Sequence, residues 1–108
     1  MSDPELDELK REFLAEAHEK VDEIHATLGH ERTPEVLERL IYLAHQLKGS
    51  GGSYGFQRIS TEAAELEKSI ERVAQGDGSL DAKIQQHVAN LRDEIERGTR
   101  ELSAASSS

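Results

Sequence analysis

Apolar residues recur every three or four positions in four successive stretches, and this spacing constrains the fold more than any other feature of the sequence. Such steps place apolar side chains along one face of an α-helix, whereas a half-buried strand would alternate apolar and polar residues. No stretch presents a competing strand pattern. The four stripes are Leu6, Leu9, Phe13, Ala17, Val21, Ile24 and Leu28; Val36, Leu37, Leu40, Ile41, Leu43, Ala44 and Leu47; Ile59, Ala63, Leu66, Ile70 and Val73; and Leu80, Ile84, Val88, Leu91, Ile95 and Leu102. The sequence therefore predicts four amphipathic helices.

Signals for helix ends bracket these stripes. Aspartate, serine and threonine cap helix N-termini, proline is tolerated in the first turn, and glycine ends helices. We expect the four helices to start at or near Asp3, Thr33, Ser60 and Ser79. Short connections between such helices favour an all-α fold, an antiparallel up-and-down four-helix bundle. We expect residues 1–102 to form this one domain and the polar residues 103–108 to form a disordered tail.

The acidic balance of the chain narrows its partners. A formal net charge of −9 disfavours both nucleic acid and anionic membrane surfaces, which are bound through clustered lysine and arginine. No apolar run approaches the roughly 18 residues that cross a bilayer, and the acidic start "MSDPELDELK" does not resemble a secretory signal. The absence of cysteine excludes disulfides and thiol chemistry. We expect a cytoplasmic protein, and a monomer, because one bundle can bury these narrow stripes.

A cluster of glycines follows the second stripe, in "LAHQLKGSGGSYGF" at residues 43–56. Each glycine inside a helix costs about 1 kcal/mol relative to alanine, so propensity alone would end this helix at Gly49. The helical projection favours a longer helix, because Gly51 and Tyr54 return to the apolar face. Gly55 is then the expected left-handed terminator, covered by the apolar Phe56. We therefore expect the second helix to run to about Tyr54.

His45 lies in this helix but not on its apolar face. At about 100° per residue it points roughly 130° away from the stripe, so we expect it to face water. Lys48, Gly49, Gly52 and Ile41 surround it on the same projection. Gly51 fits close helix packing, whereas Gly49 and Gly52 remove bulk from an exposed surface at a cost in stability. This pattern indicates that something outside the protein must come close to the imidazole.

An exposed imidazole beside a lysine suits phosphohistidine chemistry. Neutral imidazole is a nucleophile at physiological pH, and Lys48 can reach the oxygens of a phosphoryl group on the ring. A hydrolase triad would require a serine, cysteine or carboxylate partner for His45, and no helical spacing specifies one. A nucleotide-binding loop would follow a strand and is disfavoured here. His18 and His25 lie two turns apart, too far for one ion, so no metal site is expected.

The segment "AHQLKGSGGSYGF" resembles the motif of histidine phosphotransfer (Hpt) domains. In that family a histidine is followed by lysine at plus three, glycine at plus four, small residues and a further glycine. The matching positions are His45, Lys48, Gly49, Ser50 and Gly55. The later "ISTEAAELEKSIE" is similar to the family's next helix. The resemblance extends loosely over residues 6–100, and its specificity is concentrated in residues 43–67.

The resemblance implies a phosphorelay intermediate without kinase activity of its own. His45 would accept a phosphoryl group from the aspartyl phosphate of a response-regulator receiver domain and pass it to another receiver, and a hybrid histidine kinase could carry one of these receivers. Lys48 would offset charge on the phosphoryl oxygens, and Gly49 would leave room for them. The receiver would supply Mg²⁺, and this chain would bind no cofactor. We expect Ile41 to form part of the docking patch.

Two other readings remain open. The "GGSYGF" turn also resembles the phosphoacceptor domain of chemotaxis histidine kinases, which receives phosphate from its own kinase domain. The Met1 start and the serine-rich end favour a free-standing shuttle. A helical interaction module without catalytic chemistry is the alternative of a different class. That module would function without His45, whereas a phosphotransfer domain would not.

Overall fold

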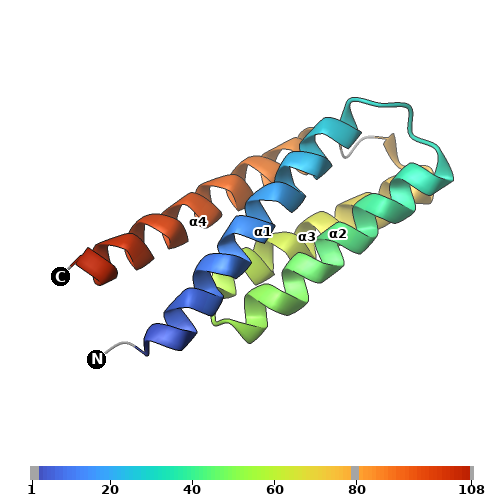
Figure 1. Cartoon of the computed structure of the whole chain (residues 1–108). Helices are drawn as coiled ribbons and strands as arrows, with labels where there is room; N and C mark the ends of the chain where they lie inside the picture. The colour runs from blue at the N-terminus through green and yellow to red at the C-terminus, as the bar shows by residue number, and fades with distance from the viewer. Residues whose placement is uncertain (1–2, 79–80, 108) are drawn as a thin grey trace.

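The structure is a computed structural model that describes residues 3–78 and 81–107. Within those residues the chain forms the helices α1 (Pro4–Leu28), α2 (Pro34–Ser53), α3 (Gln57–Ala74) and α4 (Asp81–Ser107), and no strand. Successive helices run in opposite directions (Figure 1). Each helix packs against two others, so that α1 contacts α2 and α4, and α3 contacts the same two. The predicted all-α, antiparallel up-and-down bundle is confirmed.

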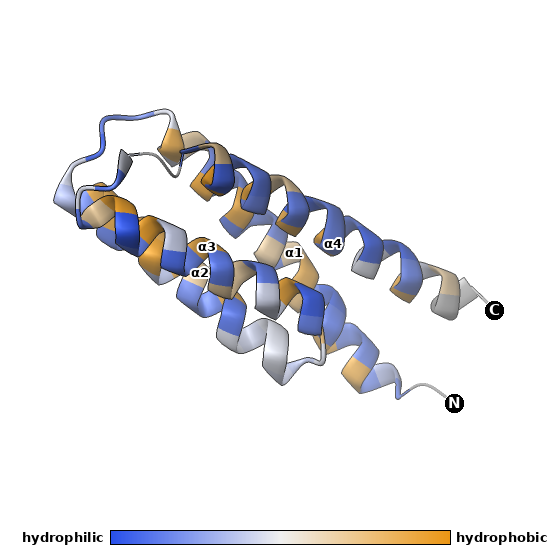
Figure 2. Ribbon diagram, turned by 180° about the vertical axis from the view of Figure 1, so that it is seen from behind, coloured by the Kyte–Doolittle hydropathy of each residue, from blue (hydrophilic) through white to orange (hydrophobic). Residues whose placement is uncertain are grey.

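The predicted apolar stripes form the core of the bundle. Figure 2 shows the hydrophobic segments mainly turned toward the interior and the hydrophilic ones toward solvent. The buried core residues are Phe13, Leu14, Ala17, Val21, Ile24, Leu28, Leu40, Leu43, Ala44, Leu47, Ile59, Ala63, Leu66, Ile70, Ile84, Val88, Leu91 and Ile95. Leu6 and Leu9 continue the first stripe but are 41% and 46% exposed. Both belong to the first turns of α1. This end of α1 extends, together with the end of α4, beyond the turn between α2 and α3 (Figure 1), so that turn does not cover it.

The second helix continues through its glycines, as predicted. It ends at Ser53, and Gly55 adopts the left-handed φ of 83°. The Phe56 amide donates to the Gly51 carbonyl at 2.8 Å, and the Gly55 amide donates to the Gly52 carbonyl at 3.2 Å. This double hydrogen bond is the Schellman arrangement that satisfies the last carbonyls of a helix. The helix therefore continues past Gly49, where propensity alone would end it, and its exposed face stays helical to Ser53.

Aromatic stacking fixes this end of α2 against α1. The rings of Tyr54 and Phe56 both stack on Phe13, with centroid distances of 5.4 and 5.6 Å. Such pairs contribute about 0.5–1.5 kcal/mol beyond the area that they bury. The expected apolar contact of Phe56 at the helix end is confirmed. The turn between α2 and α3 is thereby pinned to the bundle.

Helix starts and ends differ from the prediction at two places. The third helix begins at Gln57 rather than near Ser60, because the Ser60 amide already donates to the Phe56 carbonyl. The expected disordered tail at 103–108 is wrong for residues 103–107, which continue α4. Extending an existing helix needs no new nucleation, and alanine and serine at this end permit it. Ser79 and Leu80, the expected cap and first stripe residue of the fourth helix, lie outside the described residues.

Candidate functional site

His45 projects from the middle of α2 into solvent. Its side chain is 64% exposed, whereas Ala44 next to it and Leu47 two residues on are buried in the core. The helical projection predicted this outward direction, and the structure confirms it. The buried Ala44 and Leu47 pack this part of α2 against the core, so the imidazole is attached to a well-ordered helix.

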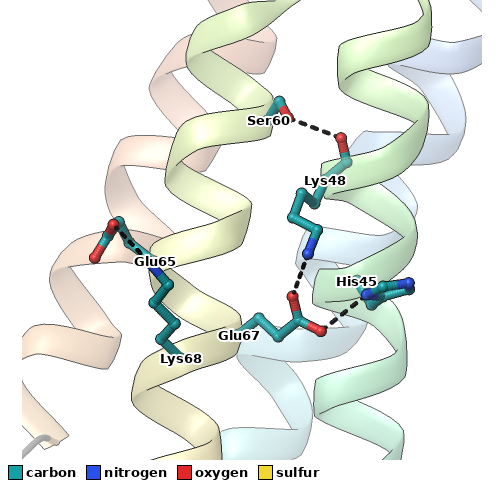
Figure 3. Close-up of polar contacts among 6 residues, drawn as sticks. All are labelled: His45, Lys48, Ser60, Glu65, Glu67 and Lys68. Carbon is teal, nitrogen blue, oxygen red and sulfur yellow. Dashed lines mark hydrogen bonds and ion pairs between the residues drawn. The ribbon is translucent and has the colours of Figure 1, made fainter.

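A glutamate of α3 contacts both polar side chains of this surface. Nδ1 of His45 lies 2.9 Å from Oε2 of Glu67, and Nζ of Lys48 donates to Oε1 of the same carboxylate at 3.1 Å (Figure 3). The Glu67 side chain is only 13% exposed, so it lies in the groove between the two helices. One carboxylate thus joins the histidine and the lysine across the helix pair.

The Glu67 contact decides which ring nitrogen of His45 is free. A carboxylate only accepts hydrogen bonds, so Nδ1 carries the hydrogen and donates it to Glu67. The other nitrogen, Nε2, then keeps its lone pair. In the neutral ring this lone pair makes Nε2 the nucleophilic nitrogen, and the side chain that carries it is exposed to solvent.

A second hydrogen bond between α2 and α3 supports this arrangement. The Ser60 hydroxyl donates to the Lys48 carbonyl at 2.8 Å (Figure 3). Lys68 lies on another side of α3, where it pairs with Glu65 at 3.8 Å and points away from His45 (Figure 3). Lys48 is therefore the cation that shares the His45 surface on this side.

The glycines of α2 differ in the space that a side chain would have at each of them. A Cβ atom on Gly49 would meet nothing within 4 Å, and one on Gly52 would only touch the Ser60 hydroxyl at 3.5 Å. A Cβ atom on the buried Gly51 would lie 3.2 Å from the Ser60 amide nitrogen. Gly51 thus permits close packing against the start of α3. Gly49 and Gly52 instead leave the surface beside His45 bare.

Comparison with known families agrees with this geometry. The sequence model of the Hpt domain matches residues 8–100. The chain belongs to the Hpt domain family. Searches of curated proteins and of solved structures find no significant match. The family resemblance predicted from residues 43–67 is thus confirmed over nearly the whole chain.

Membership of the Hpt family defines the general role of the chain. Hpt domains carry phosphoryl groups on histidine in two-component signalling, and they interact with the receiver domains of response regulators. They are phosphocarrier modules rather than autonomous kinases. No helix in the described part of the chain is long and apolar enough to cross a membrane.

The sequence did not point to Glu67 as a member of the site. Glu67 lies in the family-like segment "ISTEAAELEKSIE", directly after the buried Leu66 and three residues before the buried Ile70. A polar residue at the edge of an apolar stripe is placed to reach the neighbouring helix, and this is the signal that could have indicated it. Which neighbour it reaches depends on how the helices pack.

The other residues that the sequence analysis singled out make ordinary packing and ion-pair contacts. Ile41 is half-buried and packs against the core one turn before His45. His18 pairs with Asp22 at 3.2 Å rather than with His25. In the described residues no group of three or more histidine, aspartate or glutamate side chains could hold a metal ion.

The two kinds of glycine in this Hpt domain predict opposite effects of alanine. Gly49→Ala should raise the free energy of unfolding by roughly 0.5–1 kcal/mol, because an exposed helical glycine gains propensity without a clash. Gly51→Ala should lower it, because the methyl group must displace the backbone at the start of α3. Urea titrations of both variants measure the difference. Equal shifts in the two variants would contradict the division of the glycines.

Proposed function

We propose that His45 accepts a phosphoryl group from the aspartyl phosphate of a receiver domain and passes it to a second receiver. The observation that carries this proposal is the Nδ1 contact of the exposed His45 with Glu67 at 2.9 Å, beside Lys48 and next to bare glycines. This arrangement supplies a fixed nucleophile, a nearby cation and open space. These are the requirements of phosphoryl transfer between two proteins.

The transfer step uses the lone pair on Nε2 of His45. That nitrogen attacks phosphorus in line with the acyl phosphate, an N–P bond forms, and the P–O bond to the aspartyl carboxylate breaks. The aspartate leaves as a free carboxylate, and the ring becomes a phosphorylated imidazolium that still carries hydrogen on Nδ1. Glu67 stabilises this positive charge, because the carboxylate already accepts the Nδ1 hydrogen bond. Onward transfer to the second receiver is the reverse of this step.

Lys48 compensates negative charge during the transfer. Its side chain is 39% exposed and lies one turn after His45, so Nζ can leave Glu67 and donate to a phosphoryl oxygen. Mg²⁺ on the receiver balances the remaining charge. We propose that this chain brings no metal or cofactor of its own to the reaction.

A phosphotransfer assay with receiver domains tests the proposal. The chain is incubated with Mg²⁺ and each of the phosphorylated receiver domains of the same genome, and its intact mass is measured. We expect one added phosphoryl group that is lost in acid and survives base, as a phosphohistidine does. A second, unphosphorylated receiver should then remove it.

Two results would contradict this function. If no receiver of the genome transfers phosphate, the receiver-to-receiver role is wrong. If no receiver transfers phosphate but a kinase domain supplied with ATP labels the chain, the chain is instead a chemotaxis-type phosphoacceptor. ATP without a kinase domain should leave the mass unchanged, and labelling under that condition would reveal kinase activity in the chain itself.

A further inference from the structure

Tyr42 exposes a large aromatic ring one turn before His45. It is 50% exposed, and the other exposed large hydrophobic residues in the described part of the chain are Leu6 and Leu9 at the far end of α1. A tyrosine three residues before His45 lies about 4.5 Å along the helix and about 60° around it. An exposed aromatic side chain therefore stands beside the candidate phosphoacceptor.

Tyr42 lies on the α1 side of His45, opposite the Glu67 contact. Arg39, on the same flank of α2, donates to both carboxylate oxygens of Glu23 in α1, at 2.7 and 3.1 Å. The Lys48 side chain instead reaches α3. The surface around His45 thus has two different flanks, a charged one toward α3 and an aromatic one toward α1.

The Tyr42 ring is held in place by its neighbours. Nε2 of Gln46 donates to the phenol oxygen at 2.8 Å, and the Arg39 guanidinium lies 5.5 Å from the ring centroid. Arg39 in turn donates two hydrogen bonds to the Glu23 carboxylate, and these hydrogen bonds lower the pKa of that carboxyl below its ordinary value. An exposed side chain that is already ordered loses little conformational entropy on binding.

The size of a protein interface places Tyr42 inside the contact with a receiver. A standard interface covers about 800 Å² on each partner, and a circular patch of that area has a radius of roughly 16 Å. The aspartyl phosphate must meet His45, which puts the patch centre there. Tyr42 lies well within this radius, and tyrosine is among the residues that most often dominate binding energy near an interface centre.

We propose that Tyr42 is the aromatic anchor on which the receiver domain docks, and that it sets the affinity of the encounter rather than the rate of the chemical step. The inference rests on the proposed function of His45. Ile41, half-buried against the core, contributes less than Tyr42 to this contact. The phenol oxygen already accepts from Gln46, so its hydrogen can bond to a partner acceptor. The matching receiver surface has an apolar patch with a carbonyl acceptor beside its aspartyl phosphate.

Phosphotransfer at increasing concentrations of the chain tests this inference. The probe is the receiver domain that phosphorylates the wild-type chain fastest among those of the same genome. Tyr42→Ala should raise the concentration for half-maximal rate about 10- to 30-fold, as expected for the loss of an interface hot spot. The maximal rate should stay within about threefold, because the substitution leaves the His45 contacts in place. Tyr42→Phe, which keeps the ring, should lose much less affinity.

Two controls separate docking from chemistry. Leu9→Ala removes a comparably exposed apolar side chain far from His45 and should change nothing. Phosphorylation by phosphoramidate, a small donor that needs no docking, should proceed equally in the wild type and in Tyr42→Ala.

Three outcomes would contradict the inference. An unchanged half-maximal concentration in Tyr42→Ala would overturn the role of Tyr42 and leave the proposed function of His45 intact. A loss of phosphoramidate reactivity in that variant would also overturn it, because Tyr42 would then act through His45. A wild-type chain that takes phosphate from phosphoramidate but from no receiver would overturn the proposed function, and this inference with it.

Discussion

His45→Gln should abolish phosphoryl acceptance while the bundle stays folded. The imidazole is the proposed nucleophile, and glutamine provides no nitrogen lone pair that could replace it. The fold should survive because the side chain is 64% exposed and its contact in the structure is with Glu67 at the surface. Glutamine is also a good helix former, so α2 loses no propensity. Intact mass after incubation with a phosphorylated receiver and Mg²⁺ should show no added phosphoryl group.

His87 provides a matched control for this substitution. Its Nδ1 lies 2.9 Å from Oε2 of Glu62, the same distance as in the His45 and Glu67 pair, but its side chain is only 21% exposed. A receiver pocket cannot close around such a half-buried ring. His87→Gln should therefore keep full phosphoryl acceptance. If the His45→Gln variant is still phosphorylated, His45 is not the acceptor. The same conclusion follows if only His87→Gln loses phosphorylation.

Glu67→Ala should slow phosphoryl transfer to His45 by about 10- to 100-fold. Carboxylates that orient metal-binding histidines have effects of this size, and Glu67 holds the His45 ring in the same way. Without the carboxylate the ring can rotate, and its hydrogen moves to Nε2, the nitrogen that carries it in a free histidine side chain. The nucleophilic lone pair is then no longer the exposed one. Single-turnover transfer at saturating receiver measures the loss.

The tautomer of His45 distinguishes this mechanism from a general loss of structure. Long-range ¹H–¹⁵N NMR spectra should report hydrogen on Nδ1 in the wild-type chain and mainly on Nε2 in Glu67→Ala. Glu62→Ala removes the equivalent partner of His87 and should leave both the His45 tautomer and the transfer rate unchanged. Glu67→Gln keeps an acceptor without the charge, so its rate should lie between those of the wild type and Glu67→Ala. A wild-type Nε2–H tautomer would contradict the proposed role of Glu67.

The stability of the site and its reactivity make opposite demands on α2. The exposed Gly49 weakens the helix beside His45, and the buried Gly51 together with the left-handed Gly55 fixes its end. The aromatic contacts of Tyr54 and Phe56 with Phe13 offset part of this weakness. The helix can therefore lack side chains at Gly49 and Gly52 and still remain ordered to its end.

Local spacing was sufficient to predict much of this protein. The stripes, the caps at Asp3 and Thr33 and the passage of α2 through its glycines follow from the 3.6-residue period and from the conformational freedom of glycine. The same period predicted that His45 faces water with Gly49 and Gly52 beside it. These features depend on residues within a few turns of one helix, so the sequence alone determines them.

Contacts between helices were decided only by the tertiary structure. Glu67 meets His45 and Lys48 because α2 and α3 pack in one particular rotation and register, which no spacing within either helix fixes. The same packing turns the Ser60 hydroxyl toward the Lys48 carbonyl, so Ser60 does not serve as the expected helix cap. It also leaves Tyr42 exposed and Ile41 half-buried, although the two are neighbours in the chain. The sequence thus determined that His45 faces solvent, and the packing of α2 against α1 and α3 determined which side chains surround it.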